Sequence, residues 1–416
     1  MKFNKSIELH KRTKEIIPVC SQVFSKGYKY FPLNVAPQYI DHAKGCYVWD
    51  MDGNKYLDYI MGLCAVTLGY NYTPVDKAIK NQLKKGISFS LCNKLETELA
   101  EILRSIIPCA EMSRFFKTGS EATSAAIRLA RAYTNRDHIA YCGYHGWHDW
   151  IAGSTDRKFG VPESTIKLIH KFTYNDIHSL ENILNFESCA AIIMEPIVSK
   201  MPQGLFLHHV RNLADKHKCI LIFDEIVTGF RIGLSGAQGY FGVTPDLATF
   251  GKGMANGMPM GCVVGHKTIM NEFNNVMVSS TFGGELLSIA ASIATINEMR
   301  KKDVFGHISS IGKQLMSDIR NLGVEVNGYP GRFVYELPDN SPETRTLFMQ
   351  YMIEKGILIH PTLAINLCYS HSNWDIGKAS LSFKESLEEL KYAISKKEVK
   401  SSLKGNAIEM AFRRLD

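Results

Sequence analysis

The chain has 416 residues, of which 45% are hydrophobic and 21% charged, so it is long enough for a large core and two domains. Its net charge of +7 lies largely in short runs such as Lys396-Lys397 and Arg413-Arg414, which lack interleaved aromatic residues and indicate solvated surface rather than a nucleic-acid site. No apolar run approaches the roughly 20 residues of a membrane span, and residues 1–14 lack the apolar core of a signal peptide.

The first predicted element is a β-hairpin. Two short runs, 47–50 and 55–58, flank an Asp-Gly turn signal at 52–53. A helical pattern follows over 95–107.

Strands and helices then alternate, which predicts an α/β domain with a mainly parallel sheet. The predicted strands are 190–194, 219–223 and 261–265, and the predicted helices are 121–134, 211–217 and 288–301. We expect residues 66–300 to form this large domain. Residues 301–416 should form a smaller domain, with 1–65 packing against it, so that the small domain is discontinuous.

Two residues in the alternating region carry chemical information. Asp224 closes an apolar run at 219–223, and Lys252 lies between Gly251 and Gly253. A solvated loop lysine and a surface acid are the simplest interpretation of either residue alone. A carboxylate directly after five apolar residues, however, would be partly buried and needs a cationic partner. A pyridoxal phosphate (PLP) enzyme needs this pair, because its lysine forms a Schiff base and its carboxylate binds the pyridinium nitrogen.

The phosphate of such a cofactor needs an anion site. Gly119 and Ser120 precede a long helix, where free N–H groups and the helix dipole favour an anion, although a simple N-cap would look the same. Tyr144 is predicted to stack on the cofactor ring, and Ile226 to cover a ring face. Thr281, also before a helix, is either another cap or a second phosphate contact.

A metal site is the competing interpretation of the segment around Tyr144. His145, His148 and Asp149 have spacing that a metal could use. No further ligand cluster is evident in the sequence, so we predict no metal.

The motifs together resemble those of the class III, fold-type I, PLP-dependent aminotransferases. The matching stretches are 119–122, 144–146, 195–196, 223–231, 252–253 and 280–284. The resemblance covers roughly residues 35–395. It implies a large domain with a mainly parallel, seven-stranded type of sheet between helices, and a smaller, discontinuous α+β domain.

Carried over residue by residue, the resemblance implies specific roles. Lys252 is the Schiff-base lysine and proton shuttle, and Asp224 is the pyridinium partner. Gly119 and Ser120 bind the phosphate from one subunit. Thr281 reaches the phosphate of the neighbouring subunit's cofactor, which implies a homodimer with shared active sites.

The same resemblance adds further site residues. Tyr144 and His145 contact the cofactor, with Tyr144 counted among the catalytic residues. Glu195 is a site carboxylate near the cofactor or Arg231.

Within the family the likeness is greatest to glutamate-1-semialdehyde 2,1-aminomutase, with two departures. The aminomutases hold the substrate carboxylate with an arginine upstream of the hairpin. Residues 27–34 here contain no arginine, and Lys29 is their single basic residue. The run Gly283-Gly284-Glu285 replaces a Ser-Gly-Asn type continuation. Members with this run resemble aminotransferases of surface-polysaccharide or nucleotide-sugar pathways, and a glutamate near the mouth would suit hydroxyl or amino groups.

We therefore expect an aminotransferase that uses small molecules, a donor such as glutamate and a keto or aldehyde acceptor, with a sugar-derived acceptor as a candidate. The alternatives are the aminomutase, which is an isomerase, and more remotely a PLP-binding protein without turnover. Ten cysteines, scattered without a Cys-x-x-Cys pair, favour a reducing cytoplasm.

Overall fold

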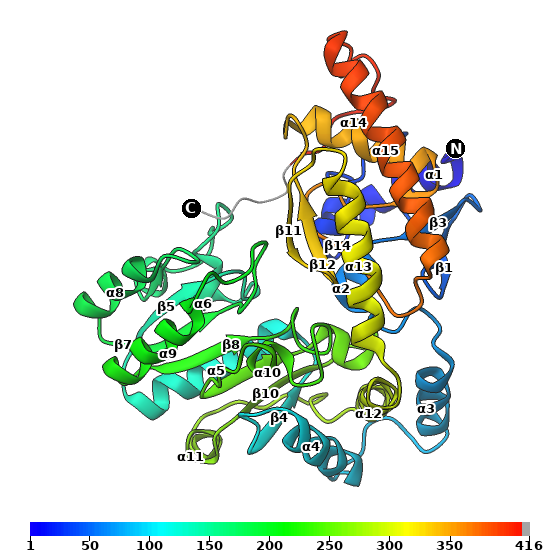
Figure 1. Cartoon of the computed structure of the whole chain (residues 1–416). Coiled ribbons are helices and arrows are strands. Elements are labelled where there is room, and N and C mark those ends of the chain that lie inside the picture. The colour runs from blue at the N-terminus through cyan, green and yellow to red at the C-terminus, as the bar shows by residue number, and fades with distance from the viewer. Residues whose placement is uncertain (410–416) are drawn as a thin grey trace. The chain divides into compact units, whose positions relative to one another are not determined.

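The computed structural model describes residues 1–409, which divide into two compact units (Figure 1). The first unit contains residues 1–63, 68–72 and 306–409, and the second contains 64–67 and 73–305. Of the two basic runs, Lys396-Lys397 is exposed, whereas Arg413-Arg414 lies outside the described residues.

A seven-stranded sheet forms the centre of the second unit, in the order β4-β10-β9-β8-β7-β5-β6. Strand β10 is antiparallel to both neighbours and the remaining pairs are parallel, so the predicted mainly parallel sheet is confirmed. The strands are β4 (Met112–Phe116), β5 (His138–Cys142), β6 (Ile169–Lys171), β7 (Cys189–Met194), β8 (Ile220–Asp224), β9 (Leu247–Phe250) and β10 (Gly261–Gly265).

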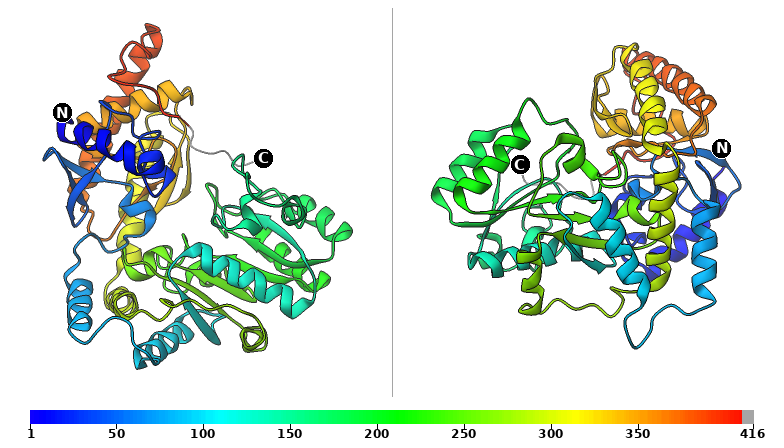
Figure 2. Two further views of the ribbon diagram at one scale, coloured as in Figure 1. Left: turned by 180° about the vertical axis from the view of Figure 1, so that it is seen from behind. Right: turned by 60° about the horizontal axis from the view of Figure 1, so that its bottom comes forward.

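Both faces of this sheet are covered. All residues of β7 and β8 are buried, as expected for continuous apolar runs in a parallel sheet. Helix α5 (Gly119–Thr134) crosses one face (Figure 2, left), and α9 (Phe206–His217) lies on the other (Figure 1). The other helices of this unit are α3 (Thr73–Leu83), α4 (Lys94–Ile106), α6 (Asp149–Ala152), α7 (Glu163–Ile166), α8 (Ile177–Phe186), α10 (Gly236–Phe241), α11 (Lys267–Met270) and α12 (Leu286–Lys301).

Helices α5, α9 and α12 begin earlier than the sequence pattern predicts, with α12 starting at Leu286 instead of residue 288. Helix α5 starts at Gly119 because Thr118 caps it: the Thr118 side chain accepts the N–H of Glu121, whose carboxylate accepts the N–H of Thr118 in return. Helix α9 starts at Phe206 instead of Arg211, and its added turn buries Phe206.

The first unit contains two small sheets. The predicted hairpin is confirmed, because β2 and β3 pair antiparallel, and Asp50 accepts the N–H groups of Asp52 and Asn54 in the turn. These strands belong to the sheet β1-β2-β3-β13, and the second sheet is β11-β12-β14. The strands are β1 (Ile40–Lys44), β2 (Tyr47–Asp50), β3 (Lys55–Asp58), β11 (Val326–Tyr329), β12 (Arg332–Tyr335), β13 (Ile357–Leu358) and β14 (Ile365–Asn366).

The longer helices of the first unit come mainly from its C-terminal part. They are α1 (Asn4–Ile16), α14 (Pro342–Glu354) and α15 (Asn373–Ser395). Two more helices cross a boundary between the units in the sequence: α2 (Met61–Cys64) and α13 (Val304–Arg320). Within residues 1–409, no helix combines the length and apolarity that crossing a membrane requires.

A buried histidine makes the stability of the first unit depend on pH. His360 Nδ1 accepts the N–H groups of Thr362 and Leu363 at 3.2 and 3.1 Å, and Nε2 donates to the Ser25 carbonyl at 3.0 Å. Burial lowers the pKa of His360 to about 3, although the bond to Ser25 acts in the opposite direction. The neutral ring is therefore the form that the fold requires.

We expect acid to destabilise the protein through His360. Because the folded-state pKa lies below that of the unfolded chain, the contribution is complete above about pH 6.5 and is lost as the pH falls toward 3, on the order of 5 kcal/mol in all. Urea unfolding at several pH values should show a weaker pH dependence in His360→Asn. Exposed His178→Asn is the matched control, and an unchanged slope in His360→Asn would contradict the assignment.

Candidate active site

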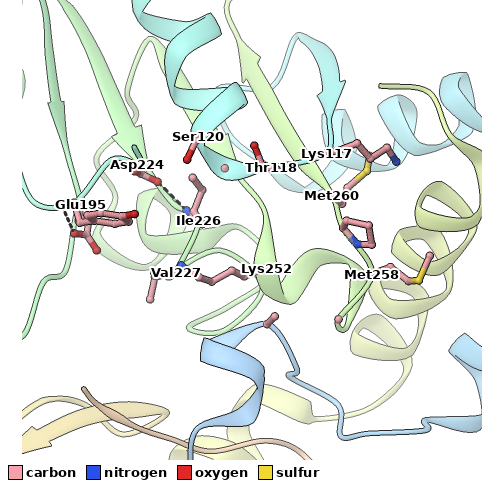
Figure 3. A pocket seen from close by; sticks show the side chains of 16 residues that line it. Lys117, Thr118, Ser120, Glu195, Asp224, Ile226, Val227, Lys252, Met258 and Met260 are labelled. Atoms are coloured by element: carbon pink, nitrogen blue, oxygen red, sulfur yellow. Dashed lines mark hydrogen bonds between the residues drawn. The ribbon is translucent and has the colours of Figure 1, made fainter. Parts of the chain in front are cut away.

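A cavity of about 300 Å³ opens within the second unit, at the carboxyl ends of β8 and β9. This is where ligands gather in open α/β sheets. It is lined by Ala65, Lys117, Thr118, Gly119, Ser120, Tyr144, Gly146, Glu195, Asp224, Ile226, Val227, Lys252, Gly257, Met258, Pro259 and Met260. Asp224, Ser120 and Lys252 approach it from three different elements (Figure 3).

Asp224 is the last residue of β8 and is only 3% exposed. One carboxylate oxygen accepts the N–H of Ile226 at 3.1 Å and the hydroxyl of Thr249 at 3.2 Å (Figure 3 shows the former). The other oxygen lies 2.8 Å from Nδ1 of His145. The carboxylate is therefore fixed in direction before any ligand arrives.

His145 lies behind Asp224 and not on the cavity wall. It is 1% exposed, and its Nε2 lies 3.1 Å from the Cys142 carbonyl. The ring is therefore held between the Asp224 carboxylate and a backbone carbonyl. His145 was predicted to contact the cofactor, whereas in this structure it lies behind Asp224 and positions that carboxylate.

Lys252 follows β9 and opens a short 3₁₀ turn, Lys252–Ala255. Its φ of +34° is a left-handed value, which few non-glycine residues adopt. Within residues 1–409 its side chain makes no hydrogen bond or ion pair, although it lines the cavity. A partly buried amine without a partner is available for chemistry.

The N-terminus of α5 forms the anion-binding end of the cavity. Its capping box uses the N–H of Glu121, and within the described residues the N–H groups of Gly119 and Ser120 have no protein acceptor. A Cβ on Gly119 would lie 2.5 Å from Ile226 Cδ1, so only glycine lets these groups approach so closely. The arrangement suits a phosphate.

Glu195 tethers the loop that carries Tyr144. Its Oε1 accepts the N–H of Tyr144 at 2.7 Å, and a Cβ on Gly143 would lie 2.7 Å from the same oxygen. The Tyr144 ring is 42% exposed and lines the cavity. Arg231, by contrast, is buried and donates to the carbonyls of Cys64 and Val66.

Some residues singled out in the sequence do not reach this cavity. Thr281 is exposed, lies before α12 and does not line it. His148 binds the Ser124 hydroxyl at 2.7 Å while His145 binds Asp224, so the two histidines considered for a metal have separate partners.

Two acidic residues have roles that the sequence did not reveal. Glu225 is fully buried and accepts the N–H groups of Ala237 and Gln238 at the start of α10; burial raises the pKa of Glu225, and these bonds act against it. Glu285 caps α12 and pairs with Lys117 at 3.0 Å. Burial raises the pKa of Glu285, but the bonds from Ser288 and Lys117 outweigh this and hold it below its ordinary value.

Comparison with known proteins identifies the family. The profile described as "Aminotransferase class-III" matches residues 30–394. The chain belongs to the class III aminotransferases.

Individual relatives agree with this assignment. The chain is 36% identical over 412 residues to the 3-aminobutyryl-CoA aminotransferase of Cloacimonas acidaminovorans, covering 94% of this chain and 98% of that protein. It is 33% identical over 411 residues to glutamate-1-semialdehyde 2,1-aminomutase 2 of Lachnoclostridium phytofermentans, covering 89% and 96%. The PLP-containing structure of the FumI protein of Sphingopyxis sp. MTA144 has a TM-score of 0.87 at 23% identity, covering 94% and 98%.

The class III aminotransferase described here is a PLP-dependent enzyme with the predicted fold-type I architecture. Its cavity fits the cofactor on the chain's own geometry, because a buried carboxylate and a helix N-terminus offer partners for a ring cation and a phosphate.

Gly146 provides a test of the phosphate end. Its φ is +98°, and a Cβ there would lie 2.3 Å from Ser120 Oγ. Gly146→Ala should displace Ser120 and weaken PLP binding about tenfold or more in an absorbance titration. Gly160→Ala is the matched control, because its φ is +88° with nothing within 4 Å of the new Cβ. Equal PLP affinity in the two variants would contradict this account.

Proposed function

We propose that the enzyme moves an amino group from an external donor such as glutamate to a keto or aldehyde acceptor. The observation that carries the proposal is the convergence of Asp224, Lys252 and the α5 N-terminus on one cavity. A PLP-binding protein without turnover would not need the unpartnered amine of Lys252.

Each residue has a distinct task in this reaction. Bound PLP supplies an electron-poor ring that accepts the electron pair of a breaking C–H bond. The Asp224 carboxylate accepts the proton of the ring nitrogen in a hydrogen bond, and His145 keeps the carboxylate oriented for that bond. Lys252 Nζ, deprotonated, takes a proton from the amine-bearing carbon and later delivers one. Gly119 and Ser120 hold the phosphate.

The walls of the cavity orient the flat cofactor. Tyr144 and Ile226 line it and would contact the two ring faces. Glu195 acts through the Tyr144 backbone, which places it among the positioning residues.

The aminomutase is the second candidate, since relatives with that name are 33% or more identical over most of their length. One contact favours the transaminase. Lys29, which stands where the aminomutases are expected to carry an arginine, pairs with Glu409 at 2.8 Å. A lysine engaged in this way is a poor holder of a substrate carboxylate.

The acceptor class stays a prediction. A sugar-derived acceptor was predicted from the run Gly283-Gly284-Glu285 and from a Glu285 charge near the mouth of the site. In this chain that charge is paired with Lys117 and used as a helix cap. A sugar-derived keto or aldehyde group is therefore one acceptor to test, beside keto acids and β-keto acyl compounds.

The absorbance spectrum with L-glutamate tests the proposal. We expect the band of the lysine-bound cofactor to bleach with glutamate and to return with a productive acceptor. Lys252→Ala should reduce turnover roughly 10³-fold or more but still retain PLP at Asp224, whereas exposed Lys216→Ala should behave as the parent. Normal turnover in Lys252→Ala would refute its role. A glutamate-insensitive band with turnover of glutamate 1-semialdehyde would establish the aminomutase instead.

We also propose that the enzyme is a homodimer. Exposed apolar side chains flank Thr281, including Leu91 at 85% and Phe282 at 58%. The two segments are adjacent, because the N–H of Leu286 donates to the carbonyl of Ile87. A second copy of the chain is the occupant that would cover this surface and bring Thr281 to a neighbouring site.

Phe282→Asp should weaken the dimer at least about tenfold, because it would bury a charge in the interface. Light scattering after size exclusion at decreasing protein concentration measures this, with Phe186→Asp on α8, where the side chain is 87% exposed, as the control. We expect PLP retention to fall together with dimerisation. A parent chain that is monomeric and active would refute the proposal.

A cytoplasmic location remains part of the proposal. It is supported by the ten cysteines, none of which forms a disulfide and eight of which are buried.

A further inference from the structure

A separate cluster of potential metal ligands lies at the other end of the seven-stranded sheet. His138 is the first residue of β5, His170 is in the edge strand β6, and Glu187 follows α8 two residues before β7. Because these strands are parallel, the cluster lies at their amino ends, whereas Asp224 closes β8 at its carboxyl end. A five-residue strand spans about 16 Å, so the cluster does not touch the cofactor cavity.

The donor atoms are close to each other. His138 Nδ1 lies 2.8 Å from His170 Nε2 and 3.4 Å from Glu187 Oε2, and all three atoms fall within 4.8 Å of one another. Zinc bonds of about 2.0 Å in a tetrahedron separate neighbouring ligand atoms by about 3.3 Å. An ion would therefore require shifts of only about half an ångström between the two rings.

The backbone holds these side chains in place. β5 and β6 pair in register, with Ala140 opposite His170, and the N–H of Cys189 donates to the carbonyl of Glu187 at 2.9 Å. Nearby Arg136 donates to the carbonyls of Cys189, His217 and Lys218, so its guanidinium is engaged there and not with Glu187.

The cluster is also accessible. The side chains of His138 and Glu187 are 32% and 35% exposed, which leaves room for water to complete a coordination shell. Two imidazoles and one carboxylate suit zinc and its d-block neighbours better than magnesium or calcium, which prefer oxygen ligands.

We propose that His138, His170 and Glu187 bind a divalent zinc-class ion that fastens the edge strand β6 and the α8–β7 turn to the sheet. The ion has no part in amino transfer. Because the ion would bind the folded chain and not the unfolded one, it would raise the free energy of unfolding by mass action.

Cobalt titration of the metal-stripped holoenzyme, kept reduced, tests this site. We expect one Co²⁺ per chain with the visible absorption of a tetrahedral ion, displaced by Zn²⁺, and a higher melting temperature with Zn²⁺ than with EDTA. His170→Gln and Glu187→Gln should each weaken Co²⁺ binding at least about tenfold, because even the loss of an outer hydrogen bond to a metal ligand costs 10–100-fold.

His178→Gln is the matched control, because His178 lies near Glu181 on α8 and no third ligand joins them among residues 1–409. It should bind Co²⁺ as the parent does. The melting temperatures of His170→Gln and Glu187→Gln in EDTA, compared with that of the parent, show whether each variant is folded without the metal. Parent-like binding in both ligand variants, or binding abolished by Cys92→Ser at the exposed thiol, would overturn the proposal.

Discussion

The site depends on one buried carboxylate. Asp224 lies at the end of a strand with both faces covered, where an unpaired charge would be costly. Its oxygens are committed to His145, Thr249 and the N–H of Ile226. The same Ile226 packs against Gly119 at the start of α5. The carboxylate and the phosphate end of the cavity are therefore positioned by one short stretch of chain.

Glycines set the size of the cavity around these groups. A side chain at Gly119 would strike Ile226, one at Gly143 would strike Glu195, and one at Gly146 would strike Ser120. Each contact joins segments distant in sequence. The space for the cofactor thus depends on how the whole unit packs, although single glycine residues make that packing possible.

The features with local signals could be predicted from the sequence. Apolar runs predicted strands β7, β8 and β10, and the position of Asp224 follows directly from where the run of β8 ends. The starts of α5 and α9 were misjudged because a cap and a buried apolar turn override helix propensity. Long-range contacts left no signal: the pairing of His145 with Asp224 joins residues 79 apart, and that of Lys117 with Glu285 joins residues 168 apart. The spacing of His145 and His148 suggested only a competing metal interpretation that the sequence did not favour, whereas the fold brings together His138, His170 and Glu187.

The path of the chain between the two units has a consequence for how the enzyme can be divided. Residues 64–67 belong to the cofactor-binding unit, although they are separated from 73–305 by a return to the other unit. Their carbonyls accept the buried guanidinium of Arg231. A fragment that begins at residue 73 would lack those carbonyl acceptors. The buried Arg231 guanidinium would then lose these two hydrogen bonds inside the protein, which is costly. The cofactor-binding unit therefore cannot be transferred to a related enzyme as residues 73–305 alone. A chimaera would also need residues 64–67 from the same parent.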